Sequence, residues 1–153
     1  MSEMPGVREL PQHQCWMLLR SSIVGRLALS LEDGPDIFPI NYVVDHGSIV
    51  LRTGQGSKLS TMLANPQVAF EVDGYDPETR EAWSVVIKGR ATEIENLHEW
   101  IQSAELPLFP WQGAPKGHFI RIEPQSTTGR QFDIVDISAW ATPVTGARPA
   151  PPE

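Results

Sequence analysis

Hydrophobic and polar residues alternate along most of the chain with a period of two. In the segment 25–31, for example, Leu27, Leu29 and Leu31 fall on one face and polar or small residues on the other. Alternation of this kind predicts a strand with one buried face. The other segments with this character are 36–45, 48–53, 67–74, 82–94 and 117–124, so the sequence predicts six strands.

Three segments have helical spacing instead. The first, 11–21, begins with Pro11, a residue suited to the first turn of a helix. The second, 57–65, stops at Pro66, and the third, 96–104, is short and amphipathic. Because these helices are few and short, they are expected at the periphery of the predicted sheet.

Prolines and glycines mark where the strands turn or are disturbed. Turns are predicted at 33–34 and 46–47, where Asp-Gly and His-Gly join adjacent strands. Pro39 removes a backbone donor inside a strand and predicts an edge or a bulge, and Gly89 predicts a bulge or another backbone passing close. Short strands joined by tight turns are typical of a mainly β protein, here a six-stranded antiparallel barrel rather than a βαβ sheet.

Composition limits the partners of the protein. Its 153 residues suit one domain, and its net charge of −7 argues against nucleic acid or an anionic membrane surface as the main partner. The single cysteine, Cys15, forms no intramolecular disulfide, and the N-terminal residues do not resemble a secretion signal. We therefore expect a cytoplasmic protein with an N-terminal arm at 1–9, one domain at 10–140 and an Ala/Pro-rich, disordered tail at 141–153.

The four histidines, His13, His46, His98 and His118, have no metal-ligand spacing. No set of residues typical of nucleophilic catalysis is apparent either. We therefore expect no metal site and identify no catalytic residue.

One stretch, "VLRTGQGSKLSTMLANP" at 50–66, joins a predicted strand to a predicted helix through a positively charged elbow. Its glycines and lysine lack the spacing of a nucleotide-binding P-loop. Ser57 is placed to cap the helix, whose first N–H groups and positive dipole favour an anion. Lys58 adds a charge, and Arg52 and Thr53 add donors from the preceding strand. The alternative is a capped turn with two solvated cations.

Two other segments suggest what the anion belongs to. Pro39 and Asn41 lie in mid-strand, where free backbone groups of an edge can bind the rim of a planar heterocycle. Trp83 offers an aromatic wall and Ser84 a polar contact, although a tryptophan in such a strand is also typical of a core. Together with the elbow, these segments favour a flat aromatic ligand that carries a phosphate.

The order of several sequence blocks resembles a known family. The blocks are "VGRLALS", "FPINYVVDHGSIVLRTGQGSKL", "NPQVAFEVDGYD", "WSVVIKGRATEI" and "FIRIEPQSTTGRQF". They resemble the pyridoxamine 5′-phosphate oxidase-related, flavin-binding split-barrel proteins, in particular the branch that includes nitroimidazole-resistance-type proteins. The resemblance runs from about residue 10 to residue 132.

This resemblance implies a homodimer with FMN bound at the interface between the two copies. It also assigns site residues: Arg52, Thr53, Ser57 and Lys58 to the phosphate, Pro39, Ile40 and Asn41 to the strand edge beside the flavin ring, and Trp83 and Ser84 to further flavin contacts. The edges expected at Pro39 and Gly89 independently favour a dimer, because a single barrel of this size would leave them uncovered.

The activity implied is that of an FMN-dependent oxidoreductase acting on a small substrate. Vitamin B6 oxidases of this family carry an arginine-rich strand before the elbow and a C-terminal Arg/His motif, and this chain has "DIFPINYV" and "GRQFDIVDISAW" there. It is therefore not expected to oxidise vitamin B6. Two alternatives stay open: a flavin storage or sensing module without turnover, and the same barrel binding a deazaflavin or haem. The role of Arg130 also stays open: it forms either a structural salt bridge or a contact with the cofactor.

Overall fold

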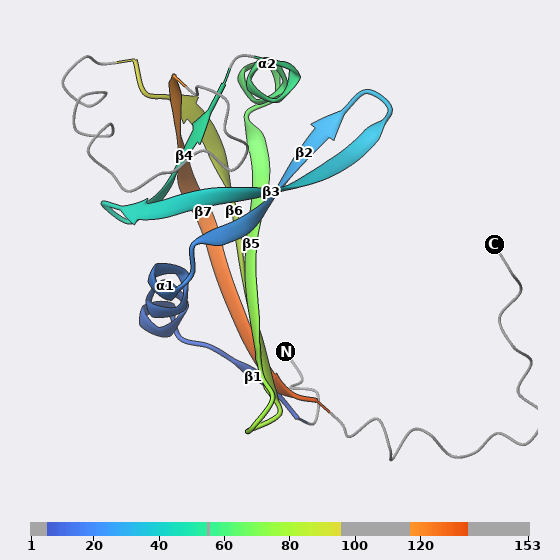
Figure 1. Cartoon of the computed structure of the whole chain (residues 1–153), viewed down its shortest axis with the longest axis vertical. Helices are drawn as coiled ribbons and strands as arrows, with labels where there is room; N and C mark the ends of the chain where they lie inside the picture. Colours follow the sequence, from blue (N-terminus) through green and yellow to red (C-terminus); the bar gives the residue numbers. More distant parts are fainter. Residues whose placement is uncertain (1–5, 55, 96–116, 135–153) are drawn as a thin grey trace, which may run out of the picture.

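Six antiparallel strands form a closed ring in the order β7-β4-β3-β2-β5-β6, because β6 pairs again with β7 (Figure 1). The computed structural model describes residues 6–54, 56–95 and 117–134. The elements are β1 (Val7–Glu9), α1 (Gln12–Ser21), β2 (Val24–Leu31), β3 (Gly34–Asp45), β4 (Ser48–Thr53), α2 (Ser57–Ala64), β5 (Gln67–Asp76), β6 (Glu81–Glu93) and β7 (His118–Asp133). The predicted mainly β, six-stranded split barrel is confirmed.

Two features of the sheet were not predicted. Within the segment assigned to an N-terminal arm, β1 forms a short strand that pairs with the end of β7. The last strand was predicted to end at Pro124, and this is wrong, because β7 continues to Asp133 and pairs with β6 along most of its length. The predicted helix at 96–104 and the tail at 141–153 lie outside the described residues.

The ring encloses one large hydrophobic core. The predicted inward faces of β2 and β5 are buried, since Leu27, Leu29, Phe70 and Val72 are at most 2 % exposed. The Tyr42 hydroxyl donates a hydrogen bond to a backbone carbonyl of α1, and its ring meets Phe70 edge-on at 4.9 Å. Both helices pack buried side chains against this core: Cys15 and Leu19 from α1, and Leu59 and Met62 from α2. Neither helix of the described chain is long and apolar enough to cross a membrane.

Gly89 marks a bulge, as predicted. The pairing of β6 with β7 shifts register between Lys88 and Gly89, so that Gly89 lies opposite Pro124. A Cβ atom at Gly89 would lie 2.3 Å from the carbonyl oxygen of Glu123, so a neighbouring backbone fills the space. Gly89 is also paired with Val68 of β5. The expectation that Gly89 leaves an uncovered edge is therefore wrong.

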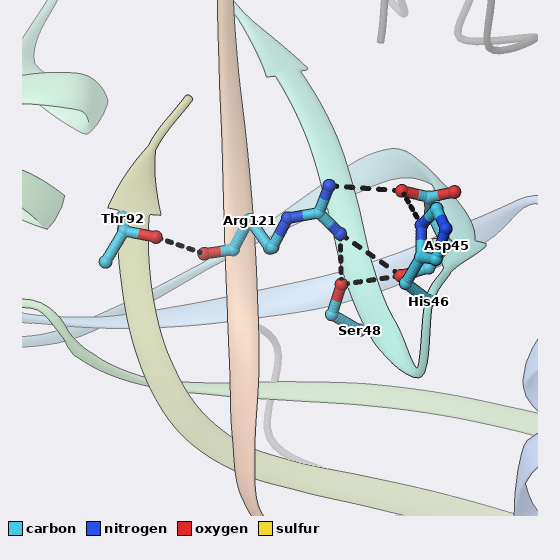
Figure 2. Close-up of polar contacts among 5 residues, drawn as sticks. All are labelled: Asp45, His46, Ser48, Thr92 and Arg121. Atoms are coloured by element: carbon cyan, nitrogen blue, oxygen red, sulfur yellow. Dashed lines mark hydrogen bonds and ion pairs between the residues drawn. The ribbon is translucent and has the colours of Figure 1, made fainter. Parts of the chain in front are cut away.

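The turn between β3 and β4 is fastened to β7 by a polar cluster (Figure 2). His46 and Gly47 form the predicted tight turn, with φ of 50° and 69°. The Arg121 guanidinium donates to Ser48 Oγ at 2.5 Å and to the Asp45 carbonyl at 3.1 Å, and it lies 3.1 Å from Asp45 Oδ2. His46 Nδ1 is 3.0 Å from the same carboxylate. The cluster thus joins three strands at one corner of the ring.

This cluster makes stability depend on pH. Burial alone would raise the pKa of Asp45, but hydrogen bonds from His46 and Arg121 outweigh it and hold the pKa below its usual value. The carboxylate therefore stabilises the fold fully above the unfolded-state pKa of about 4, and this contribution is lost as the pH falls through the lower folded value. We expect Asp45→Asn to lower the free energy of unfolding by roughly 1–2 kcal/mol at pH 7.

Urea denaturation of both proteins between pH 7 and pH 2 checks this expectation. The difference between wild type and D45N should shrink below about pH 4. A difference that stays constant down to pH 2 would show that the Asp45 charge does not fasten the turn.

Candidate functional site

Strand β3 changes neighbours half-way along its length. It pairs with β2 from Gly34 to Asn41, but with β4 only from Tyr42 to Asp45. Since Leu51 is opposite Tyr42, β4 leaves β3 at the next residue, Arg52, just before the predicted elbow. We call the place where they separate the strand notch: it is bounded by 39–41 of β3, 52–53 of β4 and the first turn of α2.

The open half of β3 confirms the edge predicted from Pro39. Pro39 has no N–H, so its pair with Arg26 is a non-hydrogen-bonded one and its backbone groups point away from β2. By the alternation of a strand, Pro35 and Ile37 point the same way. Pro35 also lacks an N–H, and the N–H of Ile37 donates to Asp36 Oδ1 at 2.8 Å. From 35 to 39 this edge therefore offers carbonyl acceptors and no spare donor.

Two cations lie at the notch, each over a phenylalanine ring. The Lys58 ammonium, in the first turn of α2, is 4.4 Å from the centre of the Phe38 ring. The Arg52 guanidinium is 5.5 Å from the centre of the Phe119 ring. Phe38 packs against the inner core, whereas Phe119 belongs to a smaller cluster on the outer side of β4. The two cations therefore approach the notch from opposite faces of the sheet.

The start of α2 differs from the prediction in one respect. The helix begins at Ser57 itself, and Gly56 precedes it as the N-cap, with a φ of 153° and no side-chain hydrogen bond. The prediction that Ser57 caps this helix is therefore wrong, and the exposed Ser57 hydroxyl lies in the first turn. Gly56 contributes no side chain that would cover the first N–H groups of the helix.

The remaining residues of the notch differ in what they expose. Ile40 points into the core and is 3 % exposed, and its backbone groups point toward Gly25 of β2 rather than toward the open edge. Pro39 is exposed and Asn41 half-buried on the opposite face of β3. Thr53 is buried, and its hydroxyl lies 3.4 Å from the Gly54 carbonyl at the elbow. The structure thus brings the predicted phosphate elbow and the predicted strand edge together.

Trp83 and Ser84 are not part of this notch within one chain. Thr53 lies opposite His118 at the start of β7, whereas Trp83 lies opposite Gln131 near its end, about 40 Å further along that strand. The two residues also face opposite sides of β6. Trp83 packs against the inner core, and its ring fills the space above Gly74, while Ser84 points outward.

Arg130 and His118 both lie in β7, at opposite ends of the strand. Arg130 lies in β7 between Glu9 of β1 and Ser84 of β6, far from the notch. Near the notch, His118 Nδ1 lies 2.5 Å from Glu93 Oε1.

The sequence did not reveal Phe38 and Phe119 as neighbours of the two cations, because strand periodicity marks an aromatic residue as buried without showing which side chain covers it. Among the described residues, no group of His, Cys, Asp and Glu side chains is suited to a metal ion.

Comparison with known proteins places this arrangement in a family. The family model for pyridoxamine 5′-phosphate oxidase matches residues 11–131, which include every element from α1 to most of β7. The chain belongs to the pyridoxamine 5′-phosphate oxidase family. An uncharacterized protein of Mycobacterium tuberculosis from the curated relatives is 34 % identical over 128 residues, covering 80 % of this chain and 84 % of that protein.

Solved structures of relatives support the same assignment. The FAD-binding protein of Mycobacterium smegmatis is 32 % identical, with a TM-score of 0.71, covering 82 % of this chain and 98 % of that one. A Bacteroides thetaiotaomicron protein named for 5-nitroimidazole antibiotic resistance has a TM-score of 0.66 over 83 % of this chain and 89 % of its own. At 14 % identity, that likeness shows a shared fold. The resemblance to this family is confirmed, and the fold is shared with the nitroimidazole-resistance-type protein.

Proposed function

We propose that the strand notch binds the phosphate and ring edge of a flavin, FMN, and that the protein is an FMN-dependent oxidoreductase. The observation that carries this proposal is the notch itself, where an acceptor edge of β3 opens beside Arg52 and Lys58. A relative that is 32 % identical is named as an FAD-binding protein, and FAD contains the same flavin and ribityl phosphate.

The residues present fit a flavin phosphate. Arg52 and Lys58 supply charge-assisted donors, and the first N–H groups of α2 add the positive end of the helix dipole. Ser57 and Thr53 place hydroxyl groups at the same elbow. Next to it, the outward-pointing carbonyls of Pro35, Ile37 and Pro39 are placed to accept a hydrogen bond from a ring N–H group. The site thus binds charge at one end and a planar polar edge at the other.

A homodimer completes the proposal. Because Trp83 and Ser84 lie about 40 Å along β7 from the elbow, they reach the same flavin only from a second copy. A two-fold dimer would bring the far end of each barrel to the notch of the other and create two equivalent sites. Ile23 and Ile37, which are 70 % and 60 % exposed, are the kind of surface that such an interface covers.

The chemistry proposed is electron transfer to a small substrate. A bound flavin supplies the redox chemistry, and the protein supplies binding, orientation and electrostatics. The side chains at the notch orient the ring and hold its phosphate, and none is proposed as an acid or base. Vitamin B6 oxidation is not proposed, because this chain has "DIFPINYV" and "GRQFDIVDISAW" where the family's B6 oxidases carry an arginine-rich strand and a C-terminal Arg/His motif. A cytoplasmic location is part of the proposal, since a lone thiol suits a reducing compartment, and cell fractionation checks it.

One experiment tests the cofactor, the turnover and the dimer. The purified protein is loaded with FMN, freed of excess flavin and sedimented while the flavin absorbance is followed. We expect the flavin to sediment with a dimer, and anaerobic NADPH or NADH to bleach it. Adding a quinone or a nitroaromatic compound should then restore the absorbance.

Each alternative has its own outcome. Bound flavin that no nicotinamide reduces would indicate a storage or sensing module. A purified protein with the spectrum of haem or a deazaflavin, and no affinity for FMN, would contradict the cofactor assignment. Flavin that sediments with a monomer would contradict the shared site.

A further inference from the structure

Two arginines of the described chain pair with carboxylates, whereas Lys58 has a different kind of neighbour. Arg26 lies 3.0 Å from Glu71 and 2.5 Å from Asp73, and Arg121 lies 3.1 Å from Asp45. In those pairs, carboxylates cancel most of the positive charge. Lys58 instead lies over the Phe38 ring, with its ammonium 4.4 Å from the ring centre.

A ring and a carboxylate hold a cation with different consequences. The quadrupole of an aromatic face attracts an ammonium group but carries no net charge, so the positive charge remains available to an anion. A lysine side chain also has four rotatable bonds, and ordering it costs entropy when it binds a ligand. A lysine side chain that is already held in place at the site loses less conformational entropy when the ligand binds.

Phe38 is suited to this task by its own packing. It is half-buried against the inner core, it pairs with Leu27 of β2, and it directly precedes Pro39 at the notch. The position of its ring is therefore fixed by the barrel rather than by α2. The Lys58–Phe38 contact consequently joins the first turn of α2 to the edge of β3.

We propose that Phe38 is a positioning residue, which holds the Lys58 ammonium at the strand notch and leaves its charge free to bind a phosphate. This inference rests on the proposed function and adds to it a residue that touches no part of the flavin.

The test is a double-mutant cycle on FMN affinity, measured by quenching of flavin fluorescence. Phe38→Leu keeps an apolar side chain but removes the aromatic face, and it should weaken binding about two- to fivefold. Phe38→Tyr keeps the face and should bind like wild type. In a Lys58→Ala background, Phe38→Leu should have no further effect, because the group that it positions is gone.

Trp16→Leu is the matched control, since Trp16 also packs half-buried against the core but lies in α1. It should leave FMN affinity unchanged, and circular dichroism confirms that each variant is folded. The inference is overturned if Phe38→Leu binds like wild type, or if it weakens binding equally with and without Lys58. If Lys58→Ala alone leaves affinity unchanged, the phosphate site of the proposed function fails as well.

Discussion

Replacing Arg52 by alanine should weaken FMN binding about ten- to a hundredfold, and replacing Lys58 by alanine should do the same. Each change removes a charge-assisted hydrogen bond to the phosphate, which contributes roughly 1.5–3 kcal/mol. Fluorescence titration of the flavin measures the dissociation constant, and thermal unfolding shows that the barrel is intact. Neither side chain is fully buried, so the fold should tolerate both changes.

Arg20→Ala is the control for charge alone. Arg20 is exposed in the last turn of α1, away from the notch, and its loss changes the net charge by the same amount. It should alter FMN affinity less than twofold, because exposed charges at a distance are screened by salt. If R52A and K58A both keep wild-type affinity, the elbow is only a turn between a strand and a helix.

The largest expected effect on stability comes from Gly89→Ala. Its new Cβ atom would lie 2.3 Å from the Glu123 carbonyl oxygen, which belongs to the backbone of a paired strand and cannot rotate away. We expect the free energy of unfolding to fall by about 2–3 kcal/mol, as in other overpacked interiors. Urea denaturation, with an unchanged slope and a lower midpoint, measures the loss.

Gly117→Ala is the matched change. No atom lies within 4 Å of the Cβ position at Gly117, so stability should stay within about 0.5 kcal/mol of wild type. Equal stability of G89A and G117A would mean that the bulge opens without cost, and that β6 and β7 are less closely packed than their register indicates.

Local patterns predicted the fold well where one face of a strand is buried. The alternation in β2 and β5 placed Leu27, Leu29 and Phe70 in the core, and Gly89 revealed the bulge. The second half of β7 was missed for two physical reasons. First, a proline usually indicates the end of a strand, but Pro124 lies at the bulge, where the pairing of β6 with β7 is already irregular. Second, the residues after Pro124 are mostly polar, because one side of this part of the strand faces solvent.

The candidate site was predicted in part. The sequence pointed to Arg52 and Lys58 by their positive charge and to Pro39 by its missing backbone N–H, because both properties follow directly from residue type. Trp83 and Ser84 were grouped with them, and within one chain they lie at the other end of the barrel, so their place at the same site stays a prediction that depends on the dimer. The positions of side chains across the sheet depend on register, which a single sequence does not specify, and so Phe38 was assigned only to a strand.

The prolines of β3 have a consequence beyond ligand binding. An open strand edge usually invites another strand, and chains that add to one another in this way grow into insoluble fibrils. Pro35 and Pro39 present no N–H to an incoming strand, and the N–H of Ile37 is already taken by Asp36. The protein can therefore keep this edge open without that edge seeding aggregation.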